Sequence, residues 1–123
     1  MNEAARALSE GVGTSFLTGK LHHPPSDGDF SGLMDRAGSR LVVVDFFADW
    51  CGPCRQVAPL FEALASEFPD VVFVKVDTQN GLSCSEDVKS LPTFRFFRNG
   101  EVIDEVVGAD ISSIKAKIQS HAF

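Results

Sequence analysis

Two apolar segments with few polar positions lie in the middle of the chain. Residues 41–47 (Leu-Val-Val-Val-Asp-Phe-Phe) form a nearly continuous apolar run, and residues 71–76 form a second run that only Lys75 interrupts. Between them, from Pro53 to the end of the segment at Pro69, apolar side chains recur at helical spacing. These positions are Val57, Leu60, Phe61, Leu64 and Phe68. The pattern predicts two parallel strands, covered on both faces and joined by a helix.

Turn and capping residues mark further elements before this unit. Residues 16–22 can form a short edge strand, which Pro24-Pro25 stops. Ser26 or Asp27 then caps a helix that Gly38 ends.

A hairpin and a final helix are predicted after the second strand. Residues 80–89 are expected to be a loop with room for one helical turn. Asn99-Gly100 supplies the positive φ angles of a type I′ turn, so residues 93–107 should form a hairpin. Asp110 caps the last helix, whose inward side chains are Ile111, Ile114 and Ile118. Alternating strands and helices predict an α/β fold with a central sheet covered on both sides.

The length allows one domain and a short extension. Residues 1–17 are expected to form an N-terminal extension, flexible or loosely docked, because glycine, threonine and serine dilute a weak helical stripe. Residues 18–123 then form the domain. The chain has 123 residues, of which 44% are hydrophobic, which is enough for a single core and too little for two.

Charge and cysteine content narrow the classes of function. The net charge is −6, from 11 basic and 17 acidic residues without a Lys/Arg run, so nucleic acid is not an expected partner. No stretch of 18 apolar residues suggests a membrane span, and the N-terminus lacks the features of a secretory or transit peptide. Three cysteines with one pair at motif spacing are unlike the pattern of small secreted domains. We expect a monomer in the cytoplasm.

The residues Trp50-Cys51-Gly52-Pro53-Cys54 carry the most specific chemistry in the chain. They lie at the junction between the first apolar run and the helix, where unpaired N–H groups and the helix dipole favour a thiolate. Cys51 should therefore be the nucleophile of a reversible Cys51–Cys54 disulfide. The alternatives are a chance pair of core thiols and half of a zinc site, which needs two more ligands. The remaining candidates, none of which forms a second pair at metal-ligand spacing, are Cys84, His22, His23 and His121.

Asp45 is a carboxyl group within a predicted buried strand, where a charge is costly. It shares a face with Val43 and Phe47, and Lys75 occupies the corresponding face of the second strand, so the two charged residues can meet if the strands are neighbours. One interpretation is a purely structural pair. The other is that a raised pKa lets Asp45 take and return the proton of Cys54 as the disulfide opens and closes.

At these residues the sequence resembles the thioredoxin family. The Trp-Cys-Gly-Pro-Cys motif, Asp45 six residues before the first cysteine, and Lys75 in Val-Lys-Val-Asp appear in the family's order. So do Leu91-Pro92-Thr93-Phe94, Asn99-Gly100 and Val107-Gly108-Ala109, and the match spans about residues 18–121. The resemblance implies a thioredoxin fold with a mixed sheet flanked by helices, and a cis peptide before Pro92 that faces the disulfide. It also implies a substrate groove lined by Trp50, Gly52, Pro53, Leu91, Pro92 and Gly108.

The resemblance also implies a dithiol-disulfide oxidoreductase that works mainly as a reductant of protein disulfides. Cys51 attacks the substrate, and Cys54, activated by Asp45 with Lys75 tuning it, resolves the mixed disulfide. No cofactor is bound, and a flavin-dependent thioredoxin reductase using NADPH recycles the oxidised protein. Two alternatives stay open: a binding module that uses the same groove without turnover, and an oxidase or isomerase of an oxidising compartment.

The chain departs from the family pattern at three places. Phe47 stands where many members have a second Trp, which is most simply a conservative core change. Glu86-Asp87 replaces an aromatic-Gly pair before Val88 and makes this turn more acidic, with a possible effect on partner choice. Cys84 is either a passive loop thiol or a regulatory one, and the nearby acidic residues Glu86 and Asp87 should raise its pKa.

Overall fold

A five-stranded mixed sheet forms the centre of the computed structural model, which describes residues 17 and 19–122. The strand order is β1-β3-β2-β4-β5. The strands are β1 (Leu21–His22), β2 (Val42–Phe47), β3 (Val72–Asp77), β4 (Thr93–Arg98) and β5 (Glu101–Val107). β3 pairs in parallel with β1 and β2, whereas β4 is antiparallel to both β2 and β5. The two apolar runs are therefore neighbouring parallel strands, as their pattern predicts.

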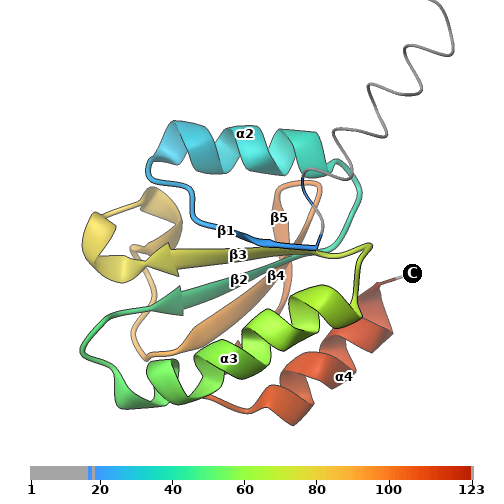
Figure 1. Ribbon diagram of the computed structural model, residues 1–123. Helices are drawn as coiled ribbons and strands as arrows, with labels where there is room; N and C mark the ends of the chain where they lie inside the picture. The colour runs from blue at the N-terminus through green and yellow to red at the C-terminus, as the bar shows by residue number, and fades with distance from the viewer. Residues whose placement is uncertain (1–16, 18, 123) are drawn as a thin grey trace, which may run out of the picture.

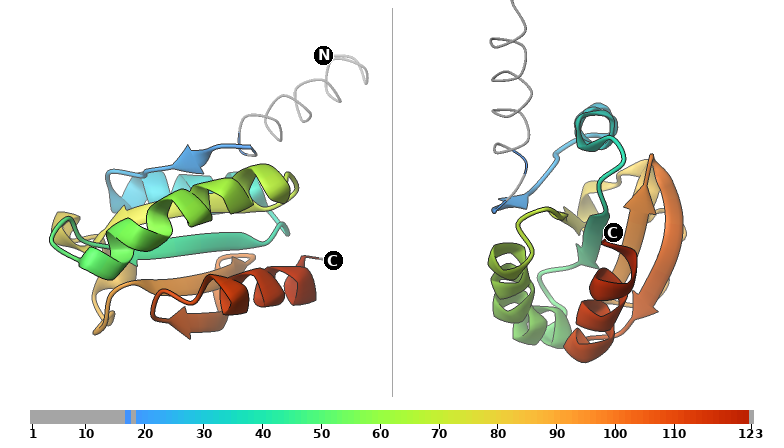
Figure 2. Two further views of the ribbon diagram at one scale, coloured as in Figure 1. Left: turned by 60° about the horizontal axis from the view of Figure 1, so that its bottom comes forward. Right: turned by 90° about the vertical axis from the view of Figure 1, so that its right-hand side faces the viewer.

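Helices cover both faces of this sheet (Figure 1). Helix α2 (Asp27–Ala37) lies on one face, and α3 (Gly52–Glu67) and α4 (Ile111–His121) lie next to each other on the other face (Figure 2). Two short 3₁₀ turns, η1 (Thr78–Asn80) and η2 (Ser83–Ser85), follow β3. Within the described residues, no helix combines the length and apolarity that crossing a bilayer requires.

Each face of the sheet has its own apolar core. Alternation along β2 sends Val42, Val44 and Phe46 into the cluster beneath α2 and Val43 into the cluster beneath α3 and α4. The second cluster is centred on Phe61 of α3, whose ring lies 5.3 Å from that of Phe73 on β3. Because both clusters are closed by helices, the central strands contain almost no exposed side chain.

Caps and turns fall where the sequence predicts them. Ser26 is the N-cap of α2 and accepts a hydrogen bond from Asp29 N (3.1 Å), and Asp110 caps α4 through Ser113 N (3.1 Å). Asn99 and Gly100 both have positive φ, 54° and 80°, as the hairpin turn requires.

Several boundaries and one burial prediction differ from the structure. In the described part of the predicted strand 16–22, only Leu21–His22 pairs with β3, whereas Leu17 is buried in the core beneath α2. The predicted loop over residues 80–89 contains one short turn, η2, as expected, and a second turn, η1, precedes it and ends at Asn80. Leu60 was expected on the buried stripe of α3 but is 49% exposed, because the helix buries only the narrower stripe through Val57 and Phe61. The predicted extension over residues 1–16 lies outside the described residues.

Candidate active site

Cys51 and Cys54 lie at the junction between β2 and α3. After β2 ends, residues 48–51 turn the chain, and Cys51 becomes the N-cap residue of α3 with extended backbone angles. Gly52 and Pro53 open the helix, where proline loses no hydrogen bond because the first N–H groups have no helical partner. The two cysteines are joined by a disulfide, and their Cα atoms are 5.2 Å apart.

The local electrostatics favour negative charge on Cys51. The backbone N–H of Cys54 donates a hydrogen bond to Cys51 Sγ (3.2 Å), so the sulfur occupies the place of a capping oxygen. The first turn of α3 contains no acidic residue that would oppose the positive end of the helix dipole. Both effects stabilise a thiolate more than a thiol at this sulfur.

Arg55 adds a cation to this turn. Its Nη1 donates to the backbone carbonyl of Asp49 (2.6 Å), and its own backbone N–H donates to Cys51 O (3.2 Å). The guanidinium therefore folds back over the segment that carries Trp50 and Cys51. Arg55 is not among the residues predicted for the site, although its position directly after the second cysteine is visible in the sequence.

The residues predicted to line a groove meet at the same end of the sheet. In the pairing of β2 with β4, Phe46 lies opposite Thr93, so Pro92 comes next to the end of β2 where the cysteine segment begins. The Leu91–Pro92 peptide bond is cis, as the resemblance implies. Gly108 N donates to Pro92 O (2.8 Å), which brings the end of β5 to the same place.

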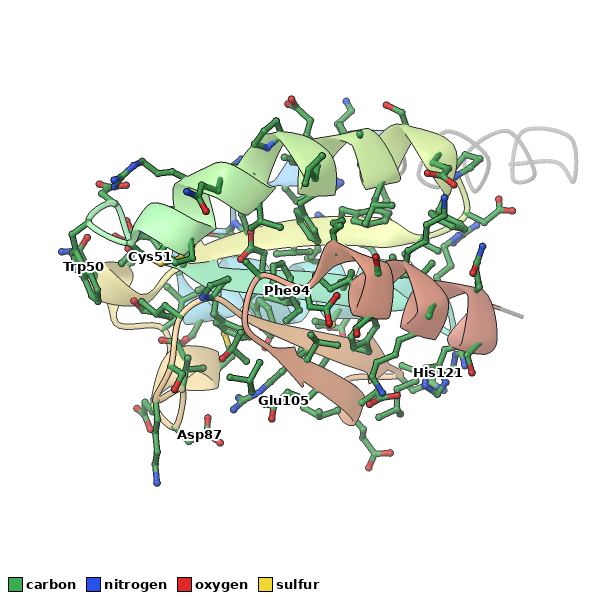
Figure 3. The ribbon with its side chains drawn as sticks, turned by 90° about the horizontal axis from the view of Figure 1, so that it is seen from below. Trp50, Cys51, Asp87, Phe94, Glu105 and His121 are labelled. Atoms are coloured by element: carbon green, nitrogen blue, oxygen red, sulfur yellow. A yellow bond between two sulfur atoms is a disulfide. The ribbon has the colours of Figure 1, made fainter. Side chains whose placement is uncertain are left out.

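Trp50 presents its ring to solvent beside the disulfide. The residue is 70% exposed, whereas Cys51 and Cys54 are both nearly buried. Figure 3 shows Trp50 and Cys51 side by side at the end of the molecule where α3 begins. A large apolar side chain so exposed next to a reactive sulfur is suited to contact a second molecule.

Asp45 is fully buried, and neither of its carboxylate oxygens has a hydrogen-bond partner. Burial raises its pKa to about 7, and the positive charge of Lys75 opposes this rise. Asp45 and Lys75 are direct partners in the pairing of β2 with β3, as predicted. They do not form an ion pair, because Lys75 Nζ lies over the ring of Phe47, 4.5 Å from its centroid.

A cavity of about 190 Å³ opens beside the second cysteine. Its walls are formed by Phe47, Ala48, Asp49, Cys54, Arg55, Ala58 and Lys75. The wall thus combines the Cys54 side chain with the cationic side chains of Arg55 and Lys75 and with Phe47.

Cys84 has the opposite character to Cys51. It is half-buried against the core beneath α2, and its thiol is free. Burial, followed by the negative charge of Asp27, raises its pKa to about 11. The expected rise in pKa is confirmed, but its expected cause is corrected: Asp87 contributes little, and burial and Asp27 come first.

Comparisons with known proteins match this arrangement. A family model described as thioredoxin matches residues 26–120, which is most of the chain. The chain belongs to the thioredoxin family. Its Cys51–Cys54 pair is the redox-active disulfide of a protein disulfide reductase, which exchanges dithiol and disulfide forms with its substrates.

Relatives and solved structures of the thioredoxin family are similar over most of their length. A thioredoxin of Ictalurus punctatus is 46% identical over 96 residues, which cover 75% of this chain and 90% of the relative. Thioredoxin H1 of Arabidopsis thaliana is 47% identical over 83 residues, covering 66% and 73%. The long form of spinach chloroplast thioredoxin f superposes with a TM-score of 0.81 at 32% identity, covering 88% of this chain and 91% of the other.

Proposed function

We propose that this chain reduces disulfides of protein substrates with Cys51 as the attacking thiolate and Cys54 as the resolving thiol. The observation that carries this assignment is the position of Cys51 as N-cap of α3, with its sulfur accepting the N–H of Cys54. The same position disfavours Cys54 as the first nucleophile, because its residue lies one turn further into the helix.

The proposed reaction has two exchange steps. The Cys51 thiolate attacks one sulfur of the substrate disulfide, and the other substrate sulfur leaves as a thiolate that takes a proton from water. Cys54 then loses its proton and attacks Cys51 Sγ, which breaks the mixed disulfide and closes Cys51–Cys54. The second substrate thiolate leaves and is protonated. The substrate gains two electrons and two protons, and the protein loses two electrons.

Asp45 is proposed to accept the proton of Cys54 and return it in the reverse reaction. A pKa of about 7 lets this carboxyl exchange protons near neutral pH, and a group without a hydrogen-bond partner is free to do so. A purely structural Asp45–Lys75 pair is less well supported, because the ammonium lies over Phe47. Lys75 is proposed to tune the pKa of Asp45 through its charge.

The substrate is proposed to lie across the end of the sheet where three chain segments meet. The exposed ring of Trp50 with Gly52 and Pro53 forms one wall. Leu91, Pro92 and Gly108 form the other, and the hydrogen bond from Gly108 N to Pro92 O supports it. An extended segment of the substrate is proposed to lie along this wall.

Membership of the family implies substrate proteins and a thioredoxin reductase as partners. We propose a flavin-dependent reductase that uses NADPH, in the cytoplasm, where an unpaired thiol such as Cys84 stays reduced. A similar solved structure, 28% identical with a TM-score of 0.78, is a complex of ferredoxin:thioredoxin reductase with thioredoxin f2. Oxidised protein should therefore be offered to each reductase type with its own electron donor, and reduction by NADPH and the flavoenzyme is expected.

Turnover against a protein disulfide tests the proposed function. Reduced chain is mixed with insulin and dithiothreitol, and the release of insulin B chain is followed by turbidity. Wild type should accelerate reduction, whereas Cys51→Ser should be inactive. Wild type without acceleration, but with measurable binding of the substrate, would favour the binding module instead.

A further inference from the structure

The connection from β3 to β4, residues 78–92, ends in the Leu91–Pro92 wall of the groove. We infer that Arg95 is a positioning residue for this wall, and that it acts by holding Asp87 and the carbonyl of Cys84 against the sheet. The inference rests on the proposed function, because it takes this wall to contact the substrate. It adds a specificity role for two residues that stand outside the catalytic motif.

Arg95 binds three groups from two different segments. Its Nη1 donates to Asp87 Oδ1 (2.8 Å) and to Cys84 O (3.3 Å), both in the connection, and its Nε donates to Glu105 Oε2 (2.8 Å) on β5. Its guanidinium carbon lies 5.5 Å from the centroid of the Phe46 ring. Figure 3 shows Asp87 and Glu105 approaching from these two different elements. The planar fork of arginine can hold such a set of acceptors, which a lysine cannot.

Arg95 and its loop partner Asp87 differ in burial. The side chain of Arg95 is only 13% exposed, whereas that of Asp87 is 74% exposed. An ion pair to so exposed a carboxylate contributes little to the free energy of unfolding. The geometric effect is larger, because the pair ties the exposed Glu86-Asp87 turn of the connection to the strand that follows Pro92.

The connection is held at other points as well: Cys84, Val88 and Leu91 pack against the core beneath α2, and Thr93 Oγ1 donates to Ser90 O (2.6 Å). A second tether lies at its middle, where Asp27 of α2 accepts from both Ser83 N (2.7 Å) and Ser83 Oγ (2.7 Å). Apart from Cys84 O, which accepts from Arg95, the backbone bonds between Ser83 and Val88 are local ones of 3.0–3.2 Å, from Ser85 N, Glu86 N and Val88 N to carbonyls three residues earlier. Short 3₁₀ bonds of this kind are weak, so the placement of Asp87 between the packed side chains of Cys84 and Val88 depends on Arg95.

Asp87→Asn tests this role with the fold left intact, since Asp87 is exposed. The matched control is Glu86→Gln, which removes the same charge from the preceding residue. Glu86 is exposed and forms no ion pair among the described residues. Three quantities are measured: KM and kcat for insulin reduction, the rate with the small disulfide 2-hydroxyethyl disulfide, and hydrogen exchange at the amides of Ser85, Glu86 and Val88.

Asp87→Asn should raise KM for insulin about 3- to 10-fold, leave kcat and the small-disulfide rate unchanged, and speed exchange in the connection about 10-fold. Glu86→Gln should change none of these. Arg95→Gln should repeat the effect of Asp87→Asn, and the double variant should add little to either, because the two residues act as a unit. Arg98→Gln, on the same strand but bonded to Ser39 O and His121 O, should leave KM unchanged.

Trp50→Ala separates failure of this inference from failure of the proposed groove. If Trp50→Ala raises KM for insulin but Asp87→Asn does not, the groove stands and the positioning role of Arg95 is wrong. Unchanged exchange in Asp87→Asn, or an equal rise in KM for Glu86→Gln, also overturns it. If neither Trp50→Ala nor Asp87→Asn changes KM, the groove itself is wrong, and the positioning role falls with it.

Discussion

Three ionisable side chains differ in acidity because the backbone places them in different surroundings. Cys51 meets the N–H groups at the start of α3, which favour its charged form. Cys84 meets the apolar core and Asp27, and its pKa rises to about 11. Asp45 is fully buried without a hydrogen-bond donor, and its pKa rises to about 7. We propose on these positions that Cys51 is the reactive thiol, Cys84 an inert thiol and Asp45 the proton acceptor.

The first prediction concerns the order in which the thiols react. Reduced protein treated with iodoacetamide at pH 7 should be labelled first at Cys51, because only the thiolate attacks. A thiol with a pKa of about 11 has roughly one molecule in 10,000 ionised at pH 7, so Cys84 should be labelled slowest. Mass spectrometry of timed samples gives the order, and labelling of Cys84 or Cys54 before Cys51 would contradict the assignment.

The second prediction concerns stability as a function of pH. The pKa of Asp45 rises from 3.8 to about 7 on folding. At a pH between these two values, the folded protein therefore keeps a proton on Asp45 that the unfolded protein has lost. The free energy of unfolding should therefore fall as pH rises from about 4 to 7, by on the order of 4 kcal/mol at about 1.4 kcal/mol per pKa unit. Asp45→Asn should remove this slope and exceed wild type in stability at pH 8.

Urea unfolding at pH 4.5 and pH 8 measures this difference directly. The exposed Asp49→Asn is the control, and it should follow the wild-type dependence on pH. Equal stability of wild type and Asp45→Asn at pH 8 would mean that Asp45 does not hold a proton in the folded protein at neutral pH. The same variant should also slow the release of substrate from the mixed disulfide between pH 6 and pH 8.

At the scale of the elements, α3 both carries the disulfide and closes one core. Phe61 is fully buried, and its ring lies 5.3 Å from Phe73 and 5.5 Å from Phe94. Leu60, its neighbour in sequence, points away and is 49% exposed. The helix is therefore held by a narrow stripe on one side, while its first turn projects the cysteines beyond the end of the sheet.

The third prediction compares these two neighbours. Phe61→Ala should lower the free energy of unfolding by about 3–5 kcal/mol, because it removes a large buried ring and leaves a cavity between α3 and the sheet. Leu60→Ala should change it by no more than about 0.5 kcal/mol. Chemical denaturation of both variants checks the difference. Equal decreases in the free energy of unfolding would mean that Leu60 belongs to the buried stripe that periodicity alone predicts.

Local sequence signals predict most elements, and contacts between distant elements are what they miss. The Asn99-Gly100 turn and the capping residues Ser26 and Asp110 act on adjacent backbone, so they could be identified without a fold. Asp45 opposite Lys75 also follows from two apolar runs in parallel register. The path of the Lys75 side chain to Phe47 does not, because it depends on packing.

The hydrogen bonds of Arg95 to Asp87, Cys84 O and Glu105 are a clearer case of contacts that local sequence signals do not predict. It requires the register that sets Arg95 opposite Glu105 and a loop that returns Asp87 to the strand. The burial of Cys84 depends on the same loop, which explains why the sequence predicts the direction of its pKa change but not the cause. The exposure of Leu60 is a smaller case, since helical spacing gives a stripe but not its width.

At the scale of the whole molecule, the active end and the edges of the sheet have different surfaces. The end of the sheet that carries Cys51 exposes Trp50, whereas the edge strand β5 exposes Val102, Ile103 and Val107 among acidic residues. Charged side chains on an edge strand disfavour pairing with a second sheet, and a net charge of −6 adds repulsion between copies. We propose on this basis that partners contact the end of the described domain that carries Trp50.

The fourth prediction follows for the oligomeric state. Light scattering of the oxidised protein should give the mass of the monomer, 13.3 kDa, across a wide range of concentrations. A dimer that disappears on mutation of Val102 and Ile103 to threonine would show that the charges on β5 do not protect its edge. A dimer that needs Cys84 would instead contradict the inert character of that thiol.

Trapping of the mixed disulfide is the most direct test that Cys51 attacks the substrate and Cys54 resolves the mixed disulfide. Cys54→Ser is reduced, mixed with a protein that has one accessible disulfide, and analysed by mass spectrometry without reductant. We expect a stable one-to-one adduct through Cys51, which Cys51→Ser does not form and which wild type releases within the mixing time as it closes Cys51–Cys54. An adduct through Cys84, or an adduct of Cys51→Ser through Cys54, would contradict it.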